Sequence, residues 1–476
     1  VALKSGRTQV GARAAASHTG ALVAASEVSI DALFRHAGVL RAATVAEFLD
    51  LATLLERQPL PAGDHVAIVT NAGGPGVLCA DACVAAGLAV PRPPDATADR
   101  LRRDLPAAAA VGNPVDMLAT ADPETFAHTV STVLAEGWAH ALIVIFVKVG
   151  DEPGAVFEAA VRRAAARVPD APPVLWVDLS SAPGATASSP LPAYTFPEEA
   201  AGALGRAAAY ARWRRRPPDP PPELGARRGD AAALLAARAG DTPAWLAPED
   251  VGALCRAYGI PLVHSRTART TPAVVAAARA VGFPVALKAI APGLTHKTEA
   301  GGVRVGLTSE AEVAAAVKTM RHDVRRAGHH VEAFLVQPVL EPAVELLVGI
   351  TNDPQLGPLV VCGAGGVRAE VERDLAVRLA PVGRLEAREA LRTLRAHRVL
   401  EGWRGAPRCD IEAVEDLVVR TGVLAAAHPE IVELDFNPVA ASPGGAVVLD
   451  ARVRVVRAAP AAPWPAVGTS PPPALD

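Results

Sequence analysis

Aromatic residues are scarce in this chain of 476 residues, at 4%, and only five cysteines are present. The cysteine number is odd and no CxxC pair occurs, which argues against a disulfide framework and for a reducing compartment. No apolar run reaches the roughly 18 residues of a membrane-spanning helix. The net charge of -3 provides no bulk positive field for nucleic acid or anionic lipid. We therefore expect a cytoplasmic protein with neither a membrane span nor a nucleic-acid partner.

The length and the pattern of strands predict several domains. Half of the residues are apolar, which is ample for real cores. Short apolar strands alternate with helices in the first half, as in a parallel, doubly wound α/β sheet, whereas the second half reads as an α+β domain. The expected divisions are residues 1–60 as the C-terminal part of a first domain, 61–216 as a second domain, 217–243 as a linker rich in proline and arginine, 244–455 as the α+β domain, and 456–476 as a disordered tail.

The motif Ser17-His18-Thr19-Gly20 lies just ahead of an expected helix. A ring nitrogen of His18 can accept a phosphoryl group, and the hydroxyls and free N–H groups of a helix start stabilise the added charge. A histidine in an ordinary loop of small residues is the alternative interpretation. The motif alone leaves the two open.

A second glycine-rich motif, Asn71–Gly76, is expected to be a tight turn before a helix that begins at Val77. Gly73, Gly74 and Gly76 allow several backbone N–H donors to converge on one anion. The motif is neither a Walker loop nor a full GxGxxG fingerprint. An ordinary strand-to-helix turn therefore remains the alternative.

In the second half, Lys288 ends an apolar strand, and His296 stands close before the pair Gly301-Gly302. A lysine at a strand end can reach the phosphates of a nucleotide, and a Gly-Gly loop can close over them. His296 is then placed to exchange phosphate with that nucleotide. A surface loop with scattered charges is the alternative interpretation.

The last motif combines Glu433-Leu434-Asp435-Phe436-Asn437 with Asp450, on two neighbouring strands. Two oxygen ligands from adjacent strands suit Mg²⁺, with phosphate and water completing its octahedron. Carboxylates that cap turns at strand ends are the alternative.

Together and in this order, these motifs resemble the ADP-forming acetyl-CoA synthetase family, which is related to succinyl-CoA synthetase. The resemblance reaches to about residue 455 and rests on several segments of the chain. These are ASHTGAL (16–22), VTNAGGPGVLCAD (69–81), GNPVDM (112–117), GFPVALK (282–288), HKTEAGGV (296–303), VELLVGITNDPQLGP (344–358), GAGGVRAEVERD (363–374) and ELDFNPV (433–439). It implies flavodoxin-like ligase domains followed by an ATP-grasp domain.

The resemblance also implies a role for each motif. His18 is expected to be the phosphohistidine and His296 a second phosphate carrier. The remaining expected residues are Ser17, Thr19, Gly20, Gly73, Gly74 and Gly76 for phosphate, Lys288, Gly301, Gly302, Gln337, Val339 and Glu345 for ATP, Asn437 and Asp450 for Mg²⁺, and Glu370 as a further acidic position.

The implied reaction interconverts acyl-CoA, ADP and phosphate with acid, CoA and ATP. Members of the family usually begin with a CoA-binding Rossmann domain, and this sequence instead opens on Val1–Lys4, which reads as a strand already in progress. A partner chain in a homo- or hetero-oligomer, or a truncated product, would account for that. Two other functions stay open, a ligand-sensing module of a lysine acetyltransferase and a non-catalytic ATP-binding subunit.

Overall fold

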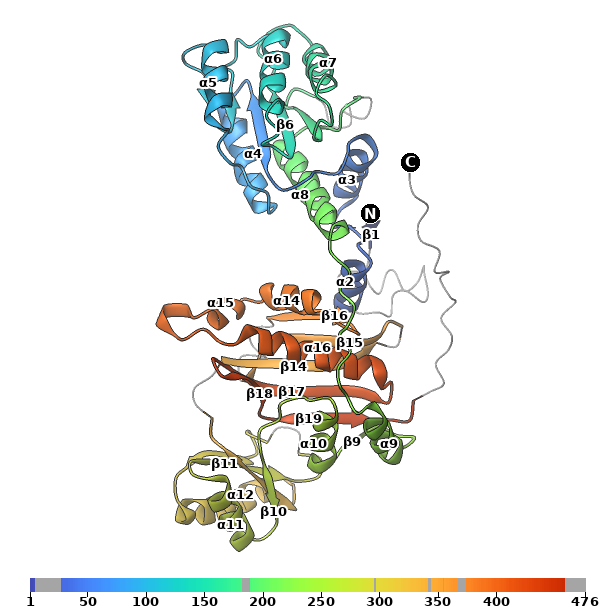
Figure 1. The fold of residues 1–476 in the computed structure, drawn as a ribbon, viewed down its shortest axis with the longest axis vertical. Helices are drawn as coiled ribbons and strands as arrows, with labels where there is room; N and C mark the ends of the chain where they lie inside the picture. Colours follow the sequence, from blue (N-terminus) through green and yellow to red (C-terminus); the bar gives the residue numbers. More distant parts are fainter. Residues whose placement is uncertain are drawn as a thin grey trace. The chain divides into compact units, whose positions relative to one another are not determined.

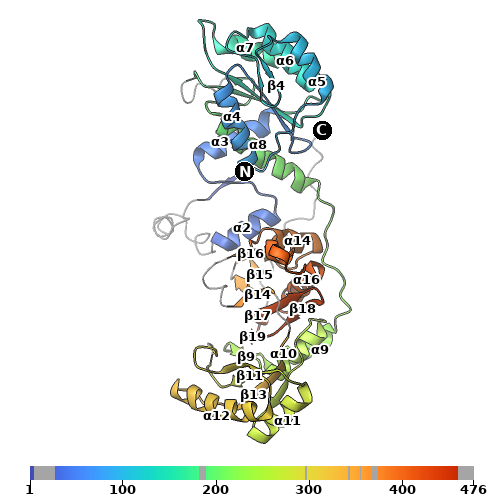
Figure 2. The ribbon, with the colours of Figure 1, turned by 90° about the vertical axis from the view of Figure 1, so that its left-hand side faces the viewer.

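The computed structural model describes residues 1–4, 27–181, 189–294, 297–340, 344–353, 355–366 and 374–458. They belong to two compact units, Val1–Pro218 and Asp219–Asp476 (Figures 1 and 2). Residues 459–476 of the predicted tail lie outside the described part. No helix among the described residues has the length and apolarity of a membrane span.

The first unit is built around a six-stranded sheet. In spatial order its strands are β4 (Ala110–Val111), β5 (Val115–Asp116), β3 (Val66–Thr70), β6 (Ala141–Phe146), β7 (Val174–Asp178) and β8 (Ala193–Tyr194). All pair in parallel except β4, which is antiparallel to β5. The three central strands are buried at every residue, as expected for a sheet that is covered on both faces.

Helices cover both faces of this sheet. One face packs against α3 (Val45–Arg57), α4 (Gly73–Ala85) and α8 (Pro197–Arg214). The other face packs against α5 (Asp95–Asp104), α6 (Pro123–Leu134) and α7 (Gly154–Ala165). The predicted doubly wound parallel sheet is therefore confirmed. Ahead of it, β1 (Ala2–Leu3) pairs in parallel with β2 (Arg41–Ala42), and α2 (Glu27–His36) lies between them in the chain.

The larger sheet of the second unit is antiparallel. In spatial order its strands are β16 (Leu375–Leu379), β15 (Gly357–Ala364), β14 (Val344–Asp353), β17 (Ile431–Ser442), β19 (Ala451–Val455) and β9 (Ala244–Trp245), with β18 (Gly445–Val448) paired to β17. Its core is completed by helices α9 (Arg228–Arg238), α10 (Pro248–Ala257), α14 (Arg384–Arg392), α15 (His397–Leu400) and α16 (Ile411–Ala427). We call this part the large lobe.

A second, four-stranded sheet forms what we call the small lobe, between Arg266 and Pro338. Its strands, in spatial order, are β10 (Arg266–Ala268), β13 (Ala333–Pro338), β11 (Val285–Ile290) and β12 (Val303–Leu307). Helices α11 (Thr271–Val281) and α12 (Glu310–Arg326) pack on one face of it and share its apolar core (Figure 1). The other face of the sheet carries Lys288 on β11 and Gln337 on β13.

Two segments differ from the sequence-based expectation. The glycines of Asn71–Gly76 do not form a separate turn, because α4 already begins at Gly73. The predicted linker, residues 217–243, contains helix α9, whose Ala231 and Leu235 are buried in the core of the large lobe. The proline and arginine content of this segment predicted a linker. The apolar residues against which α9 packs come from distant parts of the chain, so the local composition did not reveal the helix.

Candidate functional site

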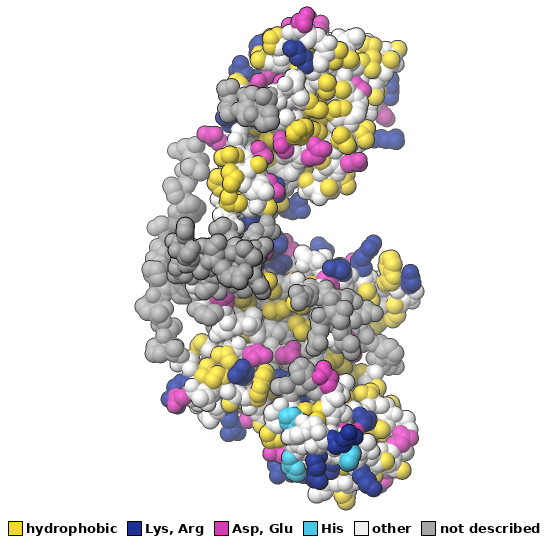
Figure 3. Space-filling view, turned by 180° about the vertical axis from the view of Figure 1, so that it is seen from behind, with side chains coloured by type: hydrophobic (Ala, Val, Ile, Leu, Met, Phe, Trp, Pro, Cys, Tyr) yellow, Lys and Arg dark blue, Asp and Glu magenta, His cyan; other side chains and the backbone are white. Residues whose placement is uncertain are grey.

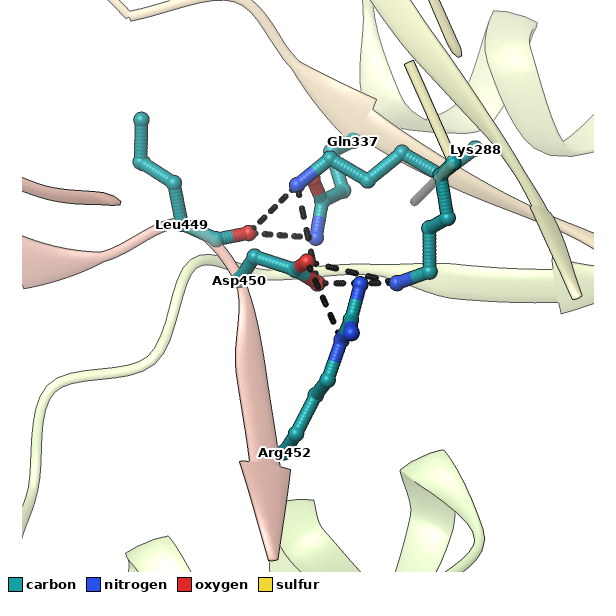
Figure 4. A network of polar contacts seen from close by, with 6 residues as sticks. Lys288, Gln337, Leu449, Asp450 and Arg452 are labelled. Carbon is teal, nitrogen blue, oxygen red and sulfur yellow. Dashed lines mark hydrogen bonds and ion pairs between the residues drawn. The ribbon is translucent and has the colours of Figure 1, made fainter. Parts of the chain in front are cut away.

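The face of the small-lobe sheet that lies opposite α11 and α12 brings Lys288 and Gln337 together. Gln337 on β13 pairs with Ala286 on β11, and residues 286 and 288 point to the same face of their strand because side chains alternate. Both side chains donate to the backbone oxygen of Leu449, over 2.7 Å from Lys288 Nζ and 3.2 Å from Gln337 Nε2. The small lobe is thus tied to the chain between β18 and β19 of the large lobe (Figure 4).

Next to Leu449, the carboxylate of Asp450 is surrounded by cations. Lys297 Nζ lies 3.3 Å from each of its oxygens, Lys288 Nζ lies 3.9 Å from Oδ1, and Arg452 Nε lies 4.0 Å from Oδ2. These side chains are only 13–27% exposed, so their charges are weakly screened. Three cationic side chains, Lys288, Lys297 and Arg452, thus converge on the Asp450 carboxylate, and such a cluster of cations suits a polyanion. Lys288 and Arg452 are drawn beside Asp450 in Figure 4.

The pKa of Lys288 reflects this environment. Burial lowers the pKa of its ammonium, the neighbouring Asp450 carboxylate raises it, and Lys297 and Arg452 lower it further. The lysine is therefore short of negative partners in the folded protein. An incoming phosphate would supply the missing charge.

Strand β17 carries acidic and amide groups on its polar face. Leu434 and Phe436 are buried in the core of the large lobe, so the alternating residues Glu433, Asp435 and Asn437 point to the other side of the sheet. Burial raises the pKa of Asp435 to about 6, and Asp450 and Glu433 raise it too, while Arg452 and Lys297 lower it. The site thus collects oxygen ligands as well as cations.

Asn437 connects this strand to Asp450 and to the end of β15. Its backbone N–H donates to the backbone oxygen of Asp450 (3.1 Å), and its Oδ1 accepts from the N–H of Gly366 (3.0 Å). Gly366 has a φ of +63°, and a side chain there would collide with the carboxylate of Glu345. The described residues hold no group of three or more His, Cys, Asp or Glu suited to a metal. Asn437 lies on β17, but Asp450 lies just before β19 and not on a strand as expected. A carboxylate and an amide oxygen are nevertheless the kind of ligand that suits Mg²⁺, which keeps several waters and binds substrate phosphates.

The Gly301-Gly302 pair forms a tight turn at the edge of this site. Gly302 N–H donates to the backbone oxygen of Lys297 (2.6 Å), and the backbone oxygen of Gly302 accepts from Ala289 N–H (2.8 Å). Gly301 has a φ of +69°, and a Cβ at Gly302 would come within 2.9 Å of the Lys297 oxygen. Both positions therefore favour glycine, and the turn holds Lys297 beside the strand of Lys288.

Gln337 and Val339, which were expected to bind ATP, lie at the end of β13. Val339 N–H donates to the backbone oxygen of Pro284 (3.0 Å), and Pro338 has no N–H to offer. The backbone of Pro338 and Val339 therefore has no free N–H to offer a ligand.

In the first unit, the start of α4 offers backbone donors. Its N-cap, Ala72, makes no side-chain hydrogen bond to the helix, and Gly73 and Gly74 are exposed. Asn71 fixes the approach to the helix through two hydrogen bonds with the backbone of Val147, of 2.8 and 2.9 Å. The N–H groups of Gly73 and Gly74 therefore receive no side-chain cap from Ala72, as an anion site requires. The carboxylate of Asp116 lies close to Gly73, where an added Cβ would come within 2.9 Å of its Oδ2.

The remaining predicted residues cannot be placed. Ser17, His18, Thr19, Gly20 and His296 lie outside the described residues, as does Glu370. The structure does bring together Lys288, Gln337, Asn437 and Asp450. It adds Lys297, Arg452 and Asp435, which the sequence analysis did not select, although the alternation of Glu433, Asp435 and Asn437 was a signal for the last of them.

Three family models match the chain. A succinyl-CoA ligase-like flavodoxin domain covers residues 1–55, a ligase-CoA domain covers 66–174, and an ATP-grasp domain covers 236–455. The fold and the site thus define an ATP-grasp protein that also carries CoA-ligase domains of flavodoxin-like fold.

Curated relatives make the assignment more specific. The chain is 32% identical over 466 residues to acetate–CoA ligase (ADP-forming) I of Archaeoglobus fulgidus and 31% identical over 462 residues to 4-hydroxybutyrate–CoA ligase (ADP-forming) of Nitrosopumilus maritimus. Each alignment covers 95% of this chain and 65% of the relative. Subunit beta of acetate–CoA ligase (ADP-forming) I of Pyrococcus furiosus is 34% identical over 202 residues, which are 42% of this chain and 87% of that subunit. The chain belongs to the ADP-forming acetate–CoA ligase family, and it spans about two thirds of the length of the first two relatives.

Proposed function

We propose that this chain is the phosphate-relay and nucleotide-binding part of an ADP-forming acyl-CoA ligase. The reaction interconverts acyl-CoA, ADP and phosphate with acid, CoA and ATP. The observation that supports this most is the cationic site at Leu449–Asp450, where Lys288, Lys297 and Arg452 converge between the two lobes. Such a site matches the charge of a nucleotide's phosphates.

Each predicted ATP-binding residue that the structure describes then has a proposed role. Lys288 holds the phosphates from a buried position, and the turn of Gly301 and Gly302 closes over them. Glu345 lines the site beside Gly366, and the carbonyl oxygens around Gln337 and Val339 take the exocyclic amino group of adenine. This arrangement orients the terminal phosphate without covalent chemistry.

Asn437 and Asp450 are the residues that would hold Mg²⁺. When bound, Mg²⁺ neutralises phosphate charge and acts as a Lewis acid. The chain itself supplies the position of these two oxygens, because the Asn437 N–H is bonded to the Asp450 backbone oxygen.

His18 and His296 are proposed to carry the phosphoryl group in turn. A neutral ring nitrogen attacks the phosphorus of an acyl phosphate, the P–O bond to the acyl group breaks, and the carboxylate leaves. A second histidine takes the group over and ADP then accepts it, which divides one hard transfer into easier steps. Gly73 and Gly74 at the start of α4 are proposed to bind phosphate during this relay. The predicted Gly76 does not fit that role, because it is buried and its N–H donates to the backbone oxygen of Ala72. Because imidazole must be neutral, activity should fall as the pH drops below about 6.5.

The relatives are longer than this chain, so we propose that a further segment or a partner subunit supplies the CoA-binding domain. All five cysteines are free and buried, which supports the proposal of a reducing, cytoplasmic location.

The experiment is phosphorylation of the purified chain by γ-labelled ATP with Mg²⁺. We expect an acid-labile, base-stable label in the wild type, little label in His296→Ala, and normal label in the control His322→Ala, which alters an exposed residue of α12. Equal labelling of wild type and His296→Ala would refute the relay. Nucleotide binding without any label would favour a ligand-sensing or non-catalytic module instead.

A further inference from the structure

Lys297 pairs with Asp450, one of the two residues to which the proposed function assigns a metal ion. Its ammonium lies 3.3 Å from both oxygens of Asp450, so it is centred on the carboxylate rather than on one oxygen. Lys288 and Arg452 approach the same group only to 3.9 and 4.0 Å. Lys297 is therefore the main counter-ion of Asp450 in the free site.

This contact differs in kind from the other bonds between the lobes. Lys288 and Gln337 donate to the backbone oxygen of Leu449, an acceptor that carries no net charge. Lys297 instead pairs with a charged side chain, and the pair is partly exposed, at 20% and 19%. An ion pair of this kind can be exchanged for another cation while the backbone contacts stay in place.

The backbone of Lys297 keeps its place next to the proposed phosphate site, whichever partner its side chain has. Its oxygen accepts from Gly302 N–H at the start of the turn that leads into β12. Only the side chain, with its four methylene groups, has to move when Asp450 finds another partner. The destination with the greatest negative charge would be the nucleotide.

We propose that Lys297 is an exchange cation and a second phosphate-binding residue. It neutralises Asp450 while the site is free, and it moves to the nucleotide's phosphates when the metal takes over the carboxylate. Metal and nucleotide then bind with positive coupling. The metal gives the Asp450 carboxylate a new cation and so releases Lys297, and the nucleotide's phosphates give the released Lys297 a new anionic partner. This inference rests on the proposed function.

The test measures binding rather than turnover. Mn²⁺ replaces Mg²⁺ because it accepts the same oxygen ligands, and its free form is followed by electron paramagnetic resonance. ADP binding is followed by calorimetry with and without Mn²⁺. The variants are Lys297→Met, the charge-preserving Lys297→Arg, and the control Lys318→Met on the exposed face of α12. Lysines, arginines and histidines gather on the surface of the small lobe (Figure 3), so the control removes the same charge from this lobe.

For Lys297→Met we expect Mn²⁺ alone to bind about tenfold more tightly, since its competitor is gone. The factor by which Mn²⁺ strengthens ADP binding should fall about tenfold. Lys297→Arg and Lys318→Met should stay close to the wild type in both measurements.

Unchanged Mn²⁺ affinity together with an unchanged coupling factor in Lys297→Met would overturn the proposal, because the lysine would then be a structural tie. Weaker Mn²⁺ binding in that variant would overturn it as well. A wild type that binds no ADP would refute both this inference and the proposed function, whereas ADP binding without the Lys297 effects would refute the inference alone.

Discussion

The two units are proposed to bind phosphate in different ways. The second unit uses charged side chains, with Lys288 and Lys297 brought to Asp450 from different strands and turns. The described part of the first unit uses backbone N–H groups at Gly73 and Gly74, where α4 begins without a side-chain cap. A side-chain site depends on charge and on strand register, whereas a helix-start site depends on how closely the backbone packs. Substitutions that remove charge should therefore weaken phosphate binding by the second unit, whereas the helix start of the first unit should respond to added methyl groups.

The largest effect is expected from Lys288→Met. The variant removes a buried ammonium with a direct bond to Leu449, and Met keeps most of the apolar stem. A charge-assisted hydrogen bond to phosphate contributes about 3 kcal/mol when well buried, so ADP affinity should fall about 100-fold. Calorimetry with ADP and Mg²⁺ measures this, with Lys318→Met as the control. An unchanged affinity would show that the cationic site of the second unit does not bind phosphate.

The second prediction compares two glycines of the large lobe. Gly366 and Gly357 both have positive φ, of +63° and +80°, but only at Gly366 would a Cβ meet another group, the Glu345 carboxylate. Gly357→Ala should therefore cost about 1 kcal/mol from backbone strain alone. Gly366→Ala should cost about 2 kcal/mol more and weaken ADP binding as well, because Glu345 and Asn437 must shift. Urea unfolding measures the free energy of unfolding of each variant, and calorimetry measures its ADP affinity. Equal losses of stability in the two variants would mean that Gly366 has no special role in the site.

Much of the second unit's site could be predicted because side chains alternate between the two faces of a β-strand. The apolar runs around Lys288 and Asn437 predicted strands, and both residues lie on strands, β11 and β17. What the sequence could not supply was the contact of Lys297 with Asp450. The two residues are 153 positions apart, and only the packing of the small lobe against the large lobe brings them together.

In the first unit, the strands of the sheet could be predicted from the sequence, but the start of a helix could not. Its strands β3, β6 and β7 follow from continuous apolar runs, and the predicted sheet was right. The start of α4 was misjudged because glycine and proline in Gly73–Gly76 are typical of a turn. The helix begins there since close packing overrides that preference, with Gly76 lying against Thr70 and Pro114.

That packing provides the third prediction. A Cβ at Gly76 would lie 3.1 Å from a methyl carbon of Thr70 and 3.3 Å from Pro114, whereas a Cβ at Gly74 would meet nothing within 4 Å. Gly76→Ala should destabilise the first unit by about 1 kcal/mol through overpacking. Gly74→Ala should stabilise it by about 0.5 kcal/mol, since alanine favours a helix. Hydrogen exchange of β3 and α4 measures both. Equal effects would show that α4 is not tightly packed at its start.

The smallest effect concerns the N-terminal ends of the central strands β3 and β6, where the rings of His65 and His140 stack with centroids 4.8 Å apart. Nδ1 of His140 accepts from the backbone N–H of His65 over 3.2 Å, so this nitrogen must be unprotonated. Burial lowers the pKa of His140, and His65 and Arg215 lower it further, against an opposing effect of Asp64.

Because folding lowers the pKa of His140, the unfolded chain binds the proton more readily. The stability that the neutral ring contributes is complete above the ordinary histidine pKa of about 6.5 and is lost as the pH falls below it. Hydrogen exchange in β3 and β6, corrected for its intrinsic pH dependence, should therefore show weaker protection at about pH 5 than at about pH 7.5. His140→Asn retains an acceptor without a titrating ring and should reduce that difference, while the ADP affinity of the second unit stays unchanged. If the variant shows the full pH dependence, the carboxylates of the first unit are its source rather than the histidine pair.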